Sequence, residues 1–132
     1  MDKDNVVLIV DMNQTRRNNL SSRLRILGYQ TELMSSGFQA IHRIEKMKEQ
    51  NSKHFCLILL IGDSEDMPAR EILLLSREIR KDKKKLPILY VHRETDPNAV
   101  IQTLQEGAND VLVEDSNEGP IVTKIQKLAP LE

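Results

Sequence analysis

Four reactive side chains of the chain come directly after short apolar runs. Asp11 follows VVLIV, His92 follows ILYV and Glu114 follows VLV, while Asp63 follows CLILLI after one glycine. The ends of buried strands are where many α/β proteins keep reactive groups. Carboxylates there can accept a phosphoryl group or hold Mg²⁺, and a histidine beside carboxylates can titrate near neutral pH or bind a transition metal. Because their spacing matches no metal-ligand motif, their use depends on the elements that position them.

Five runs predict the strands of a sheet, namely VVLIV, YQTELM, CLILLI, ILYV and VLV at residues 6–10, 29–34, 56–61, 88–91 and 111–113. Four of them are apolar throughout, as strands buried on both faces are. The run at 29–34 alternates instead, with Tyr29, Thr31 and Leu33 on one side, which predicts an edge strand.

Helical patterns with recognisable ends lie between these strands. Leu20, Leu24 and Leu27 share one helical face, and Gly28 follows where a left-handed cap is favourable. A second helix is indicated by a capping box at Ser36 and Gln39 and by an apolar stripe at Phe38, Ala40, Ile41, Ile44 and Met47. A third has a first-turn Pro68 and a stripe at Ile72, Leu75 and Ile79, and a fourth has the cap pair Asp96 and Pro97 and a stripe at Val100, Ile101 and Leu104. A stripe at Ile121, Ile125 and Leu128 marks the last helix. Strand and helix alternate five times, which predicts an α/β fold with a doubly wound parallel sheet and helices on both faces.

The composition favours one domain over residues 1–132 and argues against several partners. Nineteen Lys and Arg against 20 Asp and Glu leave a net charge of -1, so no global field attracts nucleic acid or an anionic membrane. The charged run at residues 77–85 is interpreted as a solvated helix end, since no aromatic residue is interleaved for base stacking. No apolar run approaches the roughly 20 residues that span a bilayer, and we expect a cytoplasmic protein. Cys56 is predicted to be a buried thiol.

Four segments carry a pattern that extends over nearly all of the chain: VLIVDMNQTRRNNLSSRLRILGY, SSGFQAI, LPILYVHR and EGANDVLVED. In this order and spacing they resemble the CheY-like receiver domain of bacterial two-component response regulators. The resemblance implies a flavodoxin-like sheet of order 2-1-3-4-5 with five helices in three layers. It also implies a reaction centre with two adjacent acids after strand one that hold Mg²⁺, a phosphoacceptor Asp ending strand three, a Thr or Ser ending strand four and a Lys ending strand five.

Four of these five reactive positions differ from the family pattern. Asp11 keeps the first acidic position, but Met12 takes the second, Ile61 the phosphoacceptor position, His92 the hydroxyl position and Glu114 the lysine position. An aliphatic side chain has no nucleophile, and a thioether is a poor ligand for Mg²⁺. Reversing a unit charge near 4 Å costs ~4 kcal/mol or more at an effective dielectric of 20. The residues therefore predict a degenerate phosphorylation pocket, with weak or absent Mg²⁺ binding, no other cofactor and no enzymatic activity.

Two other uses of these residues stay open. If strand three slipped by two residues in the comparison, Asp63 would be the acceptor, and the chain would be a phosphoryl-accepting receiver. His92 lies beside Glu114 by the implied strand order, and a nearby carboxylate favours the imidazolium, so the two residues could form a proton-sensitive pair. Arg93 or Lys3 could supply the cation instead. A flavodoxin-like cofactor site is a weaker candidate, because the loop after strand one offers only Thr15 to a phosphate.

The predicted function is a phosphorylation-independent interaction module in signal transduction, which binds another signalling protein or a fused output domain. Receivers commonly use the surface of helix four, strand five and helix five, with an aromatic residue on strand five. That position is Val111 here, and Tyr90 on strand four is interpreted as a packed core aromatic. We expect no membrane or nucleic-acid partner, while a homodimer stays open.

Overall fold

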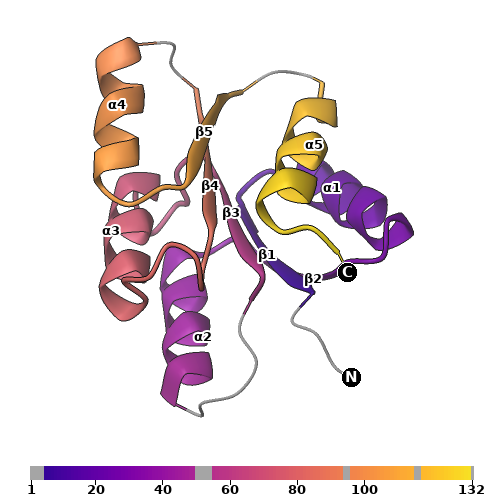
Figure 1. Cartoon of the computed structure of the whole chain (residues 1–132), viewed down its shortest axis with the longest axis horizontal. Helices are drawn as coiled ribbons and strands as arrows, with labels where there is room; N and C mark the ends of the chain where they lie inside the picture. The colour runs from indigo at the N-terminus through magenta and orange to yellow at the C-terminus, as the bar shows by residue number, and fades with distance from the viewer. Residues whose placement is uncertain (1–4, 50–54, 94–95, 115–116, 132) are drawn as a thin grey trace.

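The computed structural model describes residues 5–49, 55–93, 96–114 and 117–131. These residues form a parallel sheet of five strands in the order β2-β1-β3-β4-β5, with helices on both faces (Figure 1). The strands are β1 (Val6–Asp11), β2 (Gln30–Met34), β3 (Leu57–Ile61), β4 (Ile88–His92) and β5 (Asp110–Val113). The predicted fold class and strand order are confirmed.

Two layers of helices cover the sheet (Figure 1). One face carries α1 (Gln14–Ile26) and α5 (Gly119–Leu128), and the other carries α2 (Gly37–Glu49), α3 (Ala69–Ile79) and α4 (Pro97–Gln105). Along β3, Leu57, Leu59 and Ile61 pack on the α1 and α5 side, while Ile58 and Leu60 pack on the α2 to α4 side. Both faces of the three central strands are covered, which is why these strands are apolar up to the residues at their carboxyl ends.

Of the two predictions about edge strands, one is confirmed and one is wrong. The alternating run of β2 does form one edge, as predicted. The apolar run of β5 forms the other, so the prediction that it is buried on both faces is wrong, and Val113 at its end is 43% exposed. A run of three apolar residues is too short to distinguish an edge strand from a central one.

Most of the predicted helix ends are confirmed. Gly28 has a φ of 108° after α1, and the side chain of Asp96 caps α4. Ser36 Oγ accepts a hydrogen bond from Gln39 N at 3.3 Å, which is one of the two bonds of the predicted capping box. Pro68 caps α3 from the position before its first turn.

Several predicted core positions are exposed instead, namely Leu27, Phe38, Ile101 and Leu104. In α2 the buried positions follow a stripe that leaves Phe38 on another face: Ala40, Ile44 and Met47. In α4 the fully covered residue is Thr103, because this helix lies over the edge of the sheet beside β5 (Figure 1).

The prediction of a solvated charged run at residues 77–85 is wrong for its first residue. Arg77 is 9% exposed, and its guanidinium donates to the carbonyls of Leu86 and Gly107, which compensates its burial. Cys56 is half-buried rather than fully buried. No helix among the described residues is long and apolar enough to cross a membrane.

Candidate functional site

The carboxyl ends of the strands surround a cavity of about 630 Å³. Its lining includes the five predicted pocket residues and the alternative acceptor, namely Asp11, Met12, Ile61, His92, Glu114 and Asp63. The other lining residues are Asn13, Arg16, Gly62, Tyr90, Val91 and Arg93. Parallel strands end at the same edge of a sheet, which is why residues so distant in the chain meet here.

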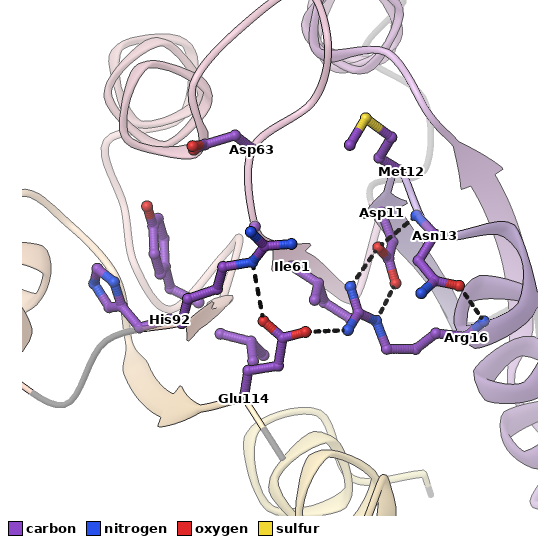
Figure 2. Close-up of a pocket in the computed structure, with 12 residues that line it drawn as sticks. Asp11, Met12, Asn13, Arg16, Ile61, Asp63, His92 and Glu114 are labelled. Atoms are coloured by element: carbon purple, nitrogen blue, oxygen red, sulfur yellow. Dashed lines mark hydrogen bonds and ion pairs between the residues drawn. The ribbon is translucent and has the colours of Figure 1, made fainter. Parts of the chain in front are cut away.

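Ile61 is the last residue of β3 and pairs in register with Asp11 of β1. Asp63 lies two residues further, after Gly62 at a φ of 65°. Its Oδ1 accepts a hydrogen bond from Ala69 N at 2.8 Å, at the start of α3. Figure 2 shows Asp63 across the opening from Asp11, with its carboxylate directed away from it. The strand register therefore sets Ile61, and not Asp63, opposite Asp11.

The guanidinium of Arg16 bridges two of the three acidic residues that line the cavity, Asp11 and Glu114. Its Nε and Nη2 donate to the two oxygens of Asp11 at 2.6 and 2.8 Å, and its Nη1 donates to Glu114 Oε1 at 2.5 Å (Figure 2). Asp11 is 1% exposed and the Arg16 side chain 16%, so little water screens this bridge. The hydrogen bond that Arg16 donates to Asp11 raises the pKa of Arg16, against the opposing effect of burial. Arg16 is a permanent cation.

Asn13 explains why Arg16 reaches this position. Asn13 caps α1: its side-chain oxygen accepts a hydrogen bond from Arg16 N at 3.0 Å, and its own N–H donates to Asp11 Oδ1 at 3.0 Å. The helix thus starts directly above the end of β1, and side chains of a first turn lean back toward the helix N-terminus. We did not predict the role of Arg16 from the sequence. The signal for it was the presence of arginines within a turn and a half after Asp11.

The predicted pair of His92 with Glu114 is wrong. His92 Nε2 lies 2.6 Å from Thr103 Oγ1 on α4. Because Thr103 donates its hydroxyl hydrogen to Ala99 O at 2.9 Å, His92 Nε2 donates to Thr103. Glu114 instead pairs with Arg16 and, at 3.4 Å, with Arg93.

The alternation of β4 accounts for this outcome. Tyr90 faces the α2 to α4 side, and His92, two residues on, faces the same side toward α4. Arg93 was one of two alternative cations in the sequence prediction, and the other, Lys3, lies outside the described residues.

The model of the response regulator receiver domain family matches residues 7–126. The chain belongs to this family. Its structure is similar to that of the chemotaxis protein CheY4 from Vibrio cholerae, with 25% sequence identity, a TM-score of 0.76 and coverage of 93% of this chain and 97% of that chain. A CheY-like receiver domain protein from Methanospirillum hungatei JF-1 has 22% identity and a TM-score of 0.74, over 93% of this chain and 92% of that chain.

A third similar structure is the CheX-CheY-BeF3-Mg²⁺ complex from Borrelia burgdorferi, with 15% identity and a TM-score of 0.80, over 93% of this chain and 87% of that chain. No curated protein matches the chain.

The residues of this receiver domain do not fit the Mg²⁺ ion that the family resemblance implies. Both oxygens of Asp11 accept hydrogen bonds from Arg16, and Met12, which is 47% exposed, offers a thioether where a hard oxygen is needed. Among the described residues, no three His, Cys, Asp or Glu side chains are grouped to hold a metal. Arg16 supplies the positive charge to this end of the receiver.

Tyr90 is a buried aromatic residue, as predicted. Its ring packs against the ring of His92, with centroids 4.4 Å apart and an angle of 43° between the planes. Burial raises the pKa of Tyr90 to about 12, and the carboxylates of Asp63 and Glu106 contribute, against the effect of Arg70. Asp63 therefore acts electrostatically on Tyr90 from its position in the loop after β3.

We expect Asp63→Asn to lower the pKa of Tyr90, because a negative charge that disfavours the phenolate is removed. The neutral phenol stabilises the fold fully below pH 10, the ordinary value, and this contribution is lost as the pH rises toward about 12. An NMR titration of the tyrosine ring measures the shift, with Tyr90→Phe to assign the signal and Glu65→Gln as a matched control in the same loop. An unchanged pKa in Asp63→Asn would contradict the placement of Asp63.

Proposed function

We propose that this receiver domain carries no phosphoryl signal and acts as a phosphorylation-independent interaction module for another signalling protein or a fused output domain. The observation that carries the proposal is the Arg16 guanidinium, held between Asp11 and Glu114 beside Ile61. A fixed cation occupies the acidic end of the pocket, and the strand end beside it has no nucleophile. The degenerate pocket comprises Asp11, Met12, Ile61, His92 and Glu114.

The charges of the pocket support this reading. In a functional phosphorylation site, a metal and a lysine would balance a phosphoryl group that comes and goes. Here Arg16 balances two carboxylates that are always present, and Arg93 adds a second cation at Glu114. With Asp63 the pocket holds three carboxylates against these two guanidinium groups, so it has no surplus positive charge to balance an added phosphoryl group.

The surface of α4, β5 and α5 is the docking face that we propose for the partner. Ile101 on α4, 52% exposed, and Val113 on β5 present large apolar side chains to solvent. Two contacts join the pocket to this face: His92 to Thr103 on α4, and Arg16 to Glu114 after β5. Both contacts join side chains of this chain and involve no phosphoryl group, which supports a docking face that keeps one arrangement. The CheY of Borrelia burgdorferi forms a complex with CheX, which supports a signalling protein as the partner.

Incubation with acetyl phosphate and Mg²⁺, read by intact mass, tests the proposal. We expect no phosphoryl adduct on this chain under conditions in which a phosphorylatable receiver, run in parallel, is modified. Amide spectra should likewise stay unchanged on addition of beryllofluoride and Mg²⁺.

Asp63 is the alternative acceptor because it lines the same cavity. An adduct that forms on the unmodified chain and is lost in Asp63→Asn would establish the phosphoryl-accepting receiver and refute the proposal. An adduct that persists in Asp63→Asn would refute both.

A further inference from the structure

The end of the molecule opposite the pocket carries a concentrated positive charge. The connection from α3 to β4 precedes β4, so it lies at the amino ends of the parallel strands (Figure 1). Residues 80–85, which we name the lysine loop, present four exposed lysines: Lys81, Lys83, Lys84 and Lys85. In the part of the chain that the structure describes, none of these four lysines forms an ion pair. Their charge is therefore open to a partner.

The lysine loop is held in place by the buried Arg77 of α3. Arg77 Nη1 donates to Arg80 O at 3.0 Å and to Leu86 O at 3.1 Å, on either side of the loop. Its Nε and Nη2 donate to Gly107 O at 3.0 and 2.7 Å, and its Nη2 also donates to Asn109 Oδ1 at 3.1 Å. These bonds fix both ends of the loop to the turn between α4 and β5.

The backbone of the loop makes further bonds of its own. Asn109 Nδ2 donates to Lys83 O at 3.0 Å. Asp82 Oδ1 accepts from Lys84 N at 2.9 Å, and Asp82 O accepts from Lys85 N at 3.1 Å. Lys83 Nζ also donates to Leu104 O at 3.5 Å. The lysines thus belong to an ordered turn, and a partner would not have to order the backbone on binding.

Asp82 is the one carboxylate within the loop, and it offsets only part of the positive charge there. All five hydrogen bonds of the Arg77 guanidinium go to carbonyl or amide oxygens. Burial lowers the pKa of Arg77, and the nearby Asp82 carboxylate acts in the opposite direction. Asp82 is the acidic residue inside the loop, and its Oδ1 is used on Lys84 N. In a chain with a net charge of -1, residues 80–85 thus bring together five basic side chains and one acidic one.

We propose that the lysine loop is a docking site for an acidic segment of a partner protein, a short run of Asp and Glu side chains. Carboxylates complement four lysines on a rigid turn. The loop offers no aromatic side chain to stack a base, which argues against a nucleic acid. The inference shares with the proposed function only the premise that the domain binds a protein, and it uses the opposite end of the molecule.

Fluorescence anisotropy with a labelled peptide of about eight glutamates tests the site, at roughly 50 mM salt where surface charges are weakly screened. A glutamine peptide of the same length is the neutral probe. We expect the intact chain to bind the glutamate peptide, and Lys83→Glu combined with Lys84→Glu to weaken binding about tenfold or more. Lys46→Glu combined with Lys48→Glu changes the net charge equally on exposed positions of α2 and should leave the affinity near that of the unmodified chain.

Four results would overturn the proposal: equal affinity in the lysine-loop variant, an equal loss in the α2 variant, equal binding of the glutamine peptide, or tighter binding of duplex DNA through the same lysines. The last would assign the loop to nucleic acid. No phosphodonor is present, so these results leave the phosphorylation test unaffected. A phosphoryl adduct in that test would likewise leave the acidic-segment assignment standing.

Discussion

The Arg16→Met chain is expected to lose about 3 kcal/mol or more of its free energy of unfolding. Methionine keeps much of the apolar stem but leaves Asp11, 1% exposed, without its two-bond partner. It also leaves Glu114 with Arg93 alone, a residue that is largely exposed. Urea unfolding of the two chains measures the loss. Arg23→Met, at an exposed position of the same helix, is the matched control and should change stability by less than about 0.5 kcal/mol.

A double variant isolates the cause. Asp11→Asn removes the buried charge, so adding it to Arg16→Met should recover most of the lost stability. If the double variant is as unstable as Arg16→Met, the loss comes from packing and not from an unpaired carboxylate. A loss in Arg16→Met no larger than that in Arg23→Met would contradict the bridge itself.

The fold could be predicted from the sequence because its central strands are unambiguous. A run such as CLILLI contains no polar residue, so it is not expected at the surface. Five alternations of strand and helix are compatible with few topologies. The exact strand order came from the family resemblance. The periphery was less predictable, as β5 and α4 show, since an edge strand and the helix above it have fewer neighbours to bury their apolar residues. Ile101 and Leu104 follow a helical stripe and are nonetheless exposed.

The members of the site could be predicted, but their contacts could not. Strand register sets Asp11 beside Ile61 and brings Glu114 to the same edge. The partner of Glu114 is Arg16, 98 residues away on a helix, and it depends on how a cap at Asn13 turns the chain. Adjacency of strands says which backbones are close, whereas the pleat decides which side chains face each other.

The charged run at residues 77–85 also shows that local composition does not determine which side chains are buried. Residues 77–85 are nearly all charged, and a solvated segment is the natural expectation for such a run. Arg77 instead turns inward, where Gly107 leaves room for it: a Cβ on Gly107 would lie 2.8 Å from Arg77 Cγ. The decisive feature is a glycine 30 residues away, which no local pattern connects to this arginine.

We expect Arg77→Met to destabilise the domain by about 3 to 4 kcal/mol, because the carbonyls of Leu86 and Gly107 would lose their donors in a buried environment. Arg77→Lys keeps the charge, but a single ammonium cannot reach both carbonyls with the geometry of a planar guanidinium, so it should recover only part of the loss. Urea unfolding measures all three chains.

Lys81→Met is the control for Arg77→Met, since it removes a positive charge from an exposed position of the same run and should change stability by less than about 0.5 kcal/mol. Hydrogen exchange adds a local measurement. The amides of Lys84 to Leu86 should exchange faster in Arg77→Met, because the loop has lost its bonds to Arg77. In Lys81→Met the exchange rates of the same amides should stay unchanged. If Arg77→Met is as stable as Lys81→Met, burial of the apolar methionine compensates the lost hydrogen bonds, and Arg77 is not what holds the loop. If stability falls while exchange in the loop stays protected, the arginine stabilises the core without ordering the lysines above it.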